Sequence, residues 1–393
     1  MTHTFGILGS GRQGTAAAYD LAAAQDASLV VMFDVDDRVA RAAAERVNAL
    51  VNREVACPQQ LDVADEAAVA AAIAPLRTVV CAVPFRFIPG CTRAAIGAGT
   101  GMVDLGGHTP TVLGQLELDA VTREAGVAVV PDCGMGPGLN NSLGMYLVEQ
   151  LEAAGATGLE VRLYDGGLPQ DRSGPWAYRS TFHINGLINE YDGQALILRD
   201  GRVTSVDTLT EVETLDFGEL GPLEAFVTSG GTSTAPHSLA GRVAVYENKT
   251  LRYPGHLDAF RAFKELGLFD ETSLEVEGTT VTPRAVFHRL LAPRIGADVV
   301  EDVCVMRAIG RGTHDGRTLE LTLNLVDRYD PATGFSAMER LTGWHAAIMA
   351  GFVADGTVPP GVHPVERAMA AARFMEEVRR RGFVLREEWT PAS

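Results

Sequence analysis

Residues 1–132 alternate between short apolar runs and longer Ala-rich stretches that favour helix. The apolar runs, which predict buried strands, are Phe5–Leu8, Leu29–Phe33, Val55–Cys57, Thr78–Val83, Met102–Leu105 and Val127–Val130. Helices are predicted between them, at Gly14–Gln25, Arg38–Leu50 and Glu66–Ala74. Short buried strands separated by helices of this length predict a parallel sheet made of βαβ units.

The pattern changes after the segment Pro131–Gly138. A helix is predicted at Asn141–Ala154, with Asn140 or Asn141 as its cap. Strands and long loops follow, the strands being Leu159–Tyr164, Ala195–Leu198, Val243–Arg252, Val300–Ile309 and Leu319–Val326. The tail returns to helix, at Ala346–Val353 and Val365–Arg381. We therefore expect a first domain at residues 1–132, completed by the C-terminal helices of 342–393, and a mixed α+β substrate and oligomerisation domain at 133–341.

Composition narrows the class of protein. The 393 residues include 33 Lys and Arg against 50 Asp and Glu, a net charge of −17 that disfavours nucleic acid as a partner. No window offers the ~20 apolar residues of a membrane span, and the N-terminus has no basic region typical of a signal peptide. The five cysteines form no CxxC pair, and no cluster has the spacing of metal ligands. We expect a soluble cytoplasmic protein without a metal.

The first predicted strand ends in a glycine-rich turn that opens directly into a helix. This turn consists of Gly9, Ser10, Gly11, Arg12, Gln13 and Gly14. In such a turn the first glycine permits the tight bend, the second lets the backbone approach a pyrophosphate, and the third allows close helix–strand contact. Free N–H groups of the helix N-terminus then bind the phosphates. The motif predicts a dinucleotide site in an N-terminal Rossmann domain, a doubly wound parallel sheet.

The second strand ends in Asp34, where an acid would bind the ribose hydroxyls of the adenosine. A carboxylate there repels a 2′-phosphate, which favours NAD. The nearby Arg12 and Arg38 could bind that phosphate, so NADP is the alternative cofactor. Cofactor sites lie at the carboxyl ends of parallel strands. The further contacts predicted on this basis are Asp62, Ala82, Val83, Pro84 and Asp104.

Several Gly-rich polar segments of the second half, together with the turn of residues 9–14, resemble the saccharopine dehydrogenase-like family, and within it the lysine 6-dehydrogenases most closely. The residues that carry the resemblance are 103–108, 131–132, 137–138, 164, 166–169, 221–226, 228–234, 249–253, 255–256, 282–284, 337–340 and 361–364. They extend over nearly the whole chain, and the stretch Pro222–Thr234 is the most specific part.

This resemblance implies a Rossmann domain joined to an α+β catalytic domain in a homodimer or homotetramer. It implies NAD-dependent oxidation of the ε-carbon of L-lysine, giving 2-aminoadipate 6-semialdehyde and ammonia. A saccharopine dehydrogenase and a carboxynorspermidine-type reductase are the alternative enzymes. The saccharopine enzymes that form the lysine–glutamate adduct carry an Arg near the segment matching Ser229–Thr234, and its absence here favours the simpler amine. Trp176 and the Cys133–Met135 segment depart from the lysine 6-dehydrogenase pattern.

Hydride removal from a carbon that bears nitrogen requires a neutral amine, and lysine's ε-amine has a pKa of ~10.4. His108 follows a strand end that should reach the nicotinamide, and it is the first candidate for the base. Asp104, Tyr253 and His256 are further catalytic candidates, and Asp104 or Asp132 could instead hold an ammonium or cap a turn. An α-carboxylate needs a cation or a nest of N–H groups. The candidates for it are Arg252, Tyr178, Arg179, Gly230, Gly231 and Thr232.

A non-catalytic, nucleotide-binding regulatory protein is the alternative from another class, because a fold does not determine function. The polar residues at the predicted strand ends favour an enzyme.

Overall fold

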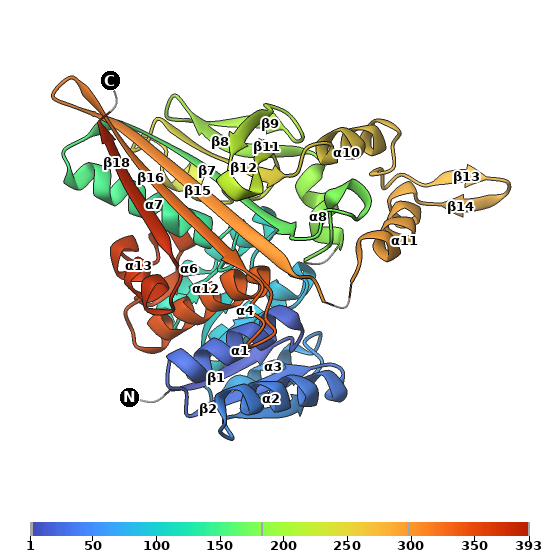
Figure 1. The fold of residues 1–393 in the computed structure, drawn as a ribbon. Coiled ribbons are helices and arrows are strands. Elements are labelled where there is room, and N and C mark those ends of the chain that lie inside the picture. Colours follow the sequence, from blue (N-terminus) through green and yellow to red (C-terminus); the bar gives the residue numbers. More distant parts are fainter. Residues whose placement is uncertain (1–2, 182–183, 298, 392–393) are drawn as a thin grey trace. The chain divides into compact units, whose positions relative to one another are not determined.

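The computed structural model describes residues 3–181, 184–297 and 299–391 (Figure 1). The chain forms two compact units, each assembled from separate stretches of sequence. The first unit comprises Met1–Gly155, Thr232–Ser238 and Glu339–Val384, and the second comprises Ala156–Gly231, Leu239–Met338 and Leu385–Ser393.

A seven-stranded parallel sheet, in the order β17-β6-β5-β4-β1-β2-β3, forms the centre of the first unit. Its strands are β1 (Thr4–Leu8), β2 (Leu29–Asp34), β3 (Ala56–Gln60), β4 (Thr78–Cys81), β5 (Gly101–Asp104), β6 (Ala128–Val130) and β17 (Gly361–Val362). The strand order reverses between β1 and β4, which is the point where open α/β sheets bind ligands. The predicted Rossmann sheet is confirmed.

Helices connect these strands, and several of them begin where a carboxylate accepts backbone N–H groups. The Asp36 side chain caps α2, and the Asp65 side chain caps α3. The helices of this unit are α1 (Arg12–Ala24), α2 (Asp37–Val51), α3 (Glu66–Ile73), η1 (Phe85–Phe87), α4 (Ile88–Ala98), α5 (Thr109–Leu116), α6 (Asp119–Glu124), α7 (Leu139–Ala153), α9 (Ala235–Ser238), α12 (Ala337–Ala354), η4 (Val365–Arg367) and α13 (Ala371–Arg380). The apolar side chains of β1, β2, β4 and β5 form its core together with α3 and α4.

The second unit is built on a nine-stranded mixed sheet, in the order β10-β11-β12-β7-β15-β16-β18, with β8 and β9 attached beside β12. Of the strand pairs described in this sheet, β12 and β7 alone are parallel. The strands are β7 (Thr157–Pro169), β8 (Gln194–Arg199), β9 (Arg202–Asp207), β10 (Glu213–Asp216), β11 (Pro222–Val227), β12 (Val245–Arg252), β15 (Asp302–His314), β16 (Arg317–Arg328) and β18 (Leu385–Pro391). The predicted α/β class with a mixed second domain is confirmed.

Helices and a separate hairpin complete the second unit. They are η2 (Pro175–Ala177), α8 (Ile184–Tyr191), η3 (Gly218–Leu220), α10 (His256–Glu265), α11 (Pro283–Ile295) and the hairpin β13 (Leu274–Val276) with β14 (Thr279–Val281). An aromatic core containing Tyr178, Tyr191 and Phe260 joins α8, α10 and α11. No described helix is both long enough and apolar enough to cross a membrane.

Three details differ from the sequence expectations. The strand predicted at Leu159–Tyr164 continues to Pro169 as part of β7, because Gly166 and Gly167 let Leu251 and Met338 pack against the backbone. The helix expected at Val365–Arg381 is divided, since the Glu149 carboxylate caps a new helix at Ala371. The expected domain boundaries also differ from the compact units: α7 and residues 232–238 belong to the first unit, and β18 pairs with β16 in the second.

Candidate functional site

The turn after β1 has the space and strain that its three glycines predict. Gly9 has φ +94°, and a Cβ there would lie 2.7 Å from the Ala82 carbonyl oxygen. A Cβ on Gly14 would lie 2.0 Å from the Gly9 carbonyl oxygen. A Cβ on Gly11 would meet nothing within 4 Å. The first and third glycines are therefore required by packing, whereas Gly11 faces open space that a pyrophosphate can enter.

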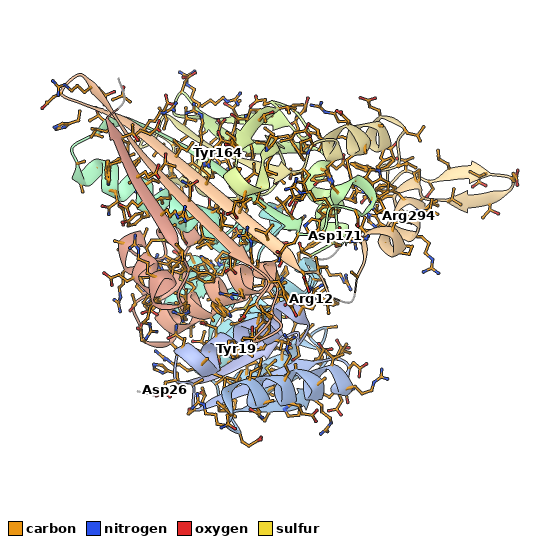
Figure 2. The ribbon with its side chains drawn as sticks, viewed as in Figure 1. Arg12, Tyr19, Asp26, Tyr164, Asp171 and Arg294 are labelled. Carbon is orange, nitrogen blue, oxygen red and sulfur yellow. The ribbon has the colours of Figure 1, made fainter. Side chains whose placement is uncertain are left out.

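The N-terminus of α1 is suited to an anion. Its N-cap is Gly11, no side chain caps it, and no acidic residue lies in its first turn. The helix dipole and the uncapped N–H groups favour negative charge at this position. Arg12, labelled in Figure 2, binds Glu339 through its Nε at 2.6 Å. The side-chain oxygen of Gln13 is buried without a hydrogen-bond partner.

Asp34 lies beside this turn, at the end of β2. One carboxylate oxygen accepts a hydrogen bond from the Ser10 N–H at 3.0 Å, and the other accepts one from the Asp36 N–H at 3.1 Å. Arg38 binds Asp36 through two nitrogens. Both arginines that could have received a 2′-phosphate, Arg12 and Arg38, are thus engaged with carboxylates.

The other predicted cofactor contacts fall in two places. Ala82, Val83 and Pro84 follow β4, and the Ala82 N–H donates to the Leu8 carbonyl beside the glycine turn. Asp62 follows β3 at the edge of the sheet, and its carboxylate accepts the Ala64 N–H. The segment after β4 therefore borders the turn, while Asp62 stabilises a loop.

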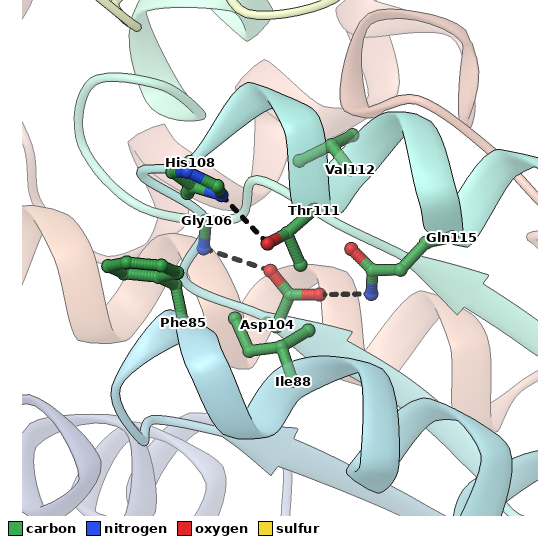
Figure 3. Close-up of a pocket in the computed structure, with 8 residues that line it drawn as sticks. All are labelled: Phe85, Ile88, Asp104, Gly106, His108, Thr111, Val112 and Gln115. Atoms are coloured by element: carbon green, nitrogen blue, oxygen red, sulfur yellow. Dashed lines mark hydrogen bonds between the residues drawn. The ribbon is translucent and has the colours of Figure 1, made fainter.

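Figure 3 shows a small pocket beyond the end of β5 that contains Asp104 and His108. Asp104 is buried and accepts hydrogen bonds from the Gln115 side chain at 2.8 Å and the Gly106 N–H at 2.9 Å. Burial raises the pKa of Asp104 to about 6, although these hydrogen bonds oppose the shift. Its oxygens are occupied by neighbouring donors, so Asp104 orders the loop that leads to His108.

His108 is half-buried at the start of α5 and stacks on Phe85, with ring centroids 4.2 Å apart. Its Nδ1 forms a hydrogen bond with the Thr111 hydroxyl at 2.8 Å. Within the described chain its Nε2 makes no hydrogen bond. Desolvation lowers the pKa of His108, which favours the neutral ring near pH 7. A neutral imidazole with a free nitrogen can accept a proton.

A group of buried carboxyls lies near Asp104 in the same unit. Asp132, at the end of β6, is buried and accepts a hydrogen bond from the Ser233 hydroxyl. Burial raises the pKa of Asp132 to about 8, and the charges of Asp104 and Glu366 add to this shift. Glu366 accepts a hydrogen bond from Thr234. These carboxyls attach residues 232–234 to the first unit.

The second unit contains a buried cation without a carboxylate partner. Only Lys249 and Arg252 are buried among its described lysines and arginines, and Lys249 binds Glu213 at 2.7 Å. Arg252 is 3% exposed and has no carboxylate within ion-pair distance in the described chain. Its Nε donates to the Tyr191 hydroxyl at 2.8 Å, and its Nη1 donates to the Leu251 carbonyl. Burial of an unpaired charge is unfavourable by several kcal/mol, so this guanidinium is suited to an incoming anion.

Tyr191 connects Arg252 to His256. The Tyr191 hydroxyl accepts from Arg252 and therefore donates to His256 Nε2, which lies 3.0 Å away. Burial, together with the charge of Arg252, lowers the pKa of His256 well below its usual value. His256 is thus a neutral acceptor that orients Tyr191.

The hydroxyl of Tyr178 is buried without a hydrogen-bond partner. Its ring lies 5.3 Å from the Arg252 guanidinium carbon. Burial raises the pKa of Tyr178 to about 12, so the hydroxyl remains a donor. Tyr178 and Arg252 together can bind a carboxylate.

The remaining predicted substrate residues have other roles in the structure. The Tyr253 hydroxyl donates to the Pro169 carbonyl, and Arg179 donates to the Arg294 carbonyl. Gly230 has φ +86°, and a Cβ on Gly231 would lie 2.1 Å from the Asn248 amide oxygen. The Thr232 carbonyl accepts from the Asn141 side chain within the first unit.

Two polar residues of the cluster were not foreseen, Glu190 and Tyr191 at the end of α8. The sequence signal for them is weak: a short helix with Leu187, Ile188 and Tyr191 on its buried side. Neither belongs to a motif, and both lie far along the chain from Arg252.

Two family models match the chain. Residues 5–130 match the saccharopine dehydrogenase NADP binding domain, and residues 134–383 match the saccharopine dehydrogenase C-terminal domain.

Curated relatives match more distantly. A saccharopine dehydrogenase (NADP(+), L-glutamate-forming) of Pyricularia oryzae is 26% identical over 219 residues, which are 54% of this chain and 48% of that protein. The enzyme of the same name from Saccharomyces cerevisiae is 23% identical over 368 residues, covering 77% of this chain and 82% of the relative. The chain thus spans about half the length of the first relative.

Among solved structures, the apo saccharopine dehydrogenase (L-Glu forming) from Saccharomyces cerevisiae has the same fold. Its TM-score is 0.80 at 20% identity, with 99% of this chain and 100% of that chain covered.

Proposed function

Because the chain belongs to the saccharopine dehydrogenase family, we propose that it is a nicotinamide dinucleotide-dependent oxidoreductase acting on a C–N bond of an amino acid. The leading substrate is L-lysine, oxidised at its ε-carbon. The observation that carries this choice is Arg252, the one buried arginine without a carboxylate among the residues that the structure describes. One such cation suits a substrate with one α-carboxylate, whereas saccharopine carries three carboxylates.

The turn and helix of residues 9–14 would hold the pyrophosphate, with Asp34 on the adenosine ribose. A nicotinamide held there would supply the acceptor for the hydride of the ε-carbon. Loss of hydride and of one proton from nitrogen gives an imine, and water then converts the imine into an aldehyde and ammonia.

His108 is the proposed base. It is neutral near pH 7 because desolvation lowers its pKa, and its Nε2 is free to take the proton of the ε-ammonium. Thr111 and Phe85 orient the ring. Within the second unit, Arg252 and Tyr178 would hold the α-carboxylate.

We further propose that NAD is preferred to NADP. Asp34 would repel a 2′-phosphate, and the guanidinium groups of Arg12 and Arg38 are bound to Glu339 and Asp36. The matching family model and the fungal relatives are named for NADP, so the purified chain should be compared with both dinucleotides.

The test is incubation of the full chain with either dinucleotide and a panel of L-lysine, saccharopine, other amino acids and diamines, following the reduced nicotinamide. We expect reduction with lysine and release of ammonia. Turnover of saccharopine alone, with release of glutamate, would establish the second candidate, which the names of the fungal relatives favour. Dinucleotide binding without turnover of any amine would favour the regulatory alternative.

A further inference from the structure

A carboxyl group that no sequence motif marks, that of Glu190, lies in the polar cluster of Arg252. Glu190 is half-buried near the end of α8, directly before Tyr191. Within the described chain its carboxyl group makes no hydrogen bond and no ion pair. It nevertheless interacts electrostatically with Arg252 and with Asp165. The cluster therefore contains an acid and a cation that do not pair with each other.

Other contacts hold the Arg252 side chain and the backbone of Glu190. The Tyr191 hydroxyl and the Leu251 carbonyl hold Arg252. The Glu190 carbonyl accepts the Ser229 N–H, which fixes the end of α8. Burial raises the pKa of Glu190 to about 8 although the charge of Arg252 opposes this rise, and Arg252 itself is a buried cation without a carboxylate, so a group that carries both an ammonium and a carboxylate would satisfy both side chains. The zwitterionic end of an α-amino acid is such a group, with an ammonium and a carboxylate on one carbon.

We propose that Glu190 binds the α-ammonium group of the substrate while Arg252 and Tyr178 bind its α-carboxylate. The buried, unpartnered hydroxyl of Tyr178 supplies a second donor to the carboxylate. This arrangement adds recognition of the substrate's α-ammonium and α-carboxylate to the proposed function. It rests on that function for the reaction at the ε-carbon. It selects amino acids with a free α-amine and rejects diamines and Nα-acylated amino acids.

Three ligands separate the contributions of the α-ammonium and the α-carboxylate to binding. L-lysine has both α-groups, Nα-acetyl-L-lysine lacks the ammonium, and cadaverine lacks the carboxylate. We expect the wild-type chain to bind lysine at least ~10-fold more tightly than either analogue, because each analogue leaves one buried charge unpaired. Calorimetry measures this binding without requiring turnover.

Glu190→Gln is the decisive variant. It should weaken lysine binding about 10-fold and leave Nα-acetyl-lysine binding unchanged, so that discrimination between the two disappears. The KM for lysine should rise more than kcat falls. Glu219→Gln, at a side chain that is 93% exposed, is the matched control and should behave as wild type.

The outcomes distinguish this proposal from the reaction itself. Lysine binding that depends on Glu190, without turnover of any amine, would support the zwitterion site and overturn the proposed reaction. Lysine turnover with equal binding of Nα-acetyl-lysine, or a Glu190→Gln variant that still discriminates, would overturn the zwitterion site alone. A melting temperature of Glu190→Gln close to that of wild type shows that the effect is on binding.

Discussion

The dinucleotide turn and the Arg252 cluster are both suited to a charged group, but they are made from different parts of the protein. The turn uses backbone N–H groups and three glycines within residues 9–14. The cluster uses side chains from the end of η2, from α8, from β12 and from α10. The first presents the partial charges of a helix end, and the second presents a full buried charge.

This difference has an energetic consequence. Every helix N-terminus has N–H groups without a partner inside the helix. An anion site there therefore requires little more than the absence of a capping side chain. An unpaired guanidinium that is 3% exposed destabilises the folded chain until an anion arrives. A variant that removes the buried charge should therefore change the stability of the folded chain as well as ligand binding. A variant of the turn should change dinucleotide binding alone.

The largest effect is expected for Arg252→Met. Its KM for lysine should rise about 100-fold, because the α-carboxylate loses its charged partner. The melting temperature should stay the same or increase, since the variant removes a buried unpaired charge. Arg179→Met is the comparison, and its KM should change little because Arg179 binds a backbone carbonyl. Steady-state kinetics and thermal unfolding check both, and a stable Arg252→Met with unchanged KM would contradict the assignment.

Gly11→Val should separate binding from folding in the turn. Its Cβ meets nothing within 4 Å, so the fold should persist, but the side chain would occupy the path of the pyrophosphate. We expect dinucleotide affinity to fall by about 30-fold or more, measured by fluorescence titration, with little change in melting temperature. Gly97→Ala, also in open space but near the C-terminal end of α4, should bind normally. Equal affinities for Gly11→Val and wild type would place the phosphates elsewhere.

Asp34→Ala should have a smaller effect, on the choice of dinucleotide. Affinity for NAD should fall about 10-fold while that for NADP changes little, because the ribose loses its acceptor and the repulsion of a 2′-phosphate is removed. Asp37→Asn at the start of α2 is the control, since Asp37 pairs with Arg41. If wild type already prefers NADP, the role assigned to Asp34 is wrong.

The smallest effect is a change in pH dependence with Asp132→Asn. The pKa of Asp132 is raised to about 8 by burial, so the folded chain retains a proton there that the unfolded chain releases near pH 4. Stability from this group is present at low pH and is lost as pH rises through about 8. The asparagine removes that loss, so its melting temperature relative to wild type should rise by about 3 °C from pH 5 to pH 9. A difference that is independent of pH would show that Asp132 titrates normally.

The sequence predicts the glycine turn and the position of Asp34 beside it because these parts are local. Gly9, Gly11 and Gly14 act through their own backbone, and Asp34 ends the strand next to the turn. Arg252 was identifiable from the need for a cation. Glu190 and Tyr191 were not, because the contact between Tyr191 and Arg252 joins residues 61 positions apart.

Packing also explains the errors in secondary structure. The strand predicted to end at Tyr164 continues to Pro169, because Gly166 and Gly167 provide room for Leu251 and Met338. The division between η4 and α13 depends on Glu149, which lies more than two hundred residues earlier in the chain. A local pattern contains neither constraint.

The strand β17 at residues 361 and 362 has a consequence for synthesis. It pairs with β6, and α12 and α13 belong to the same unit as the first six strands. During synthesis, the edge of the N-terminal sheet at β6 therefore stays uncovered until residues 361 and 362 have left the ribosome. During that interval β6 presents an unpaired edge, so nascent chains should need chaperone protection longer than the early position of the nucleotide motif suggests.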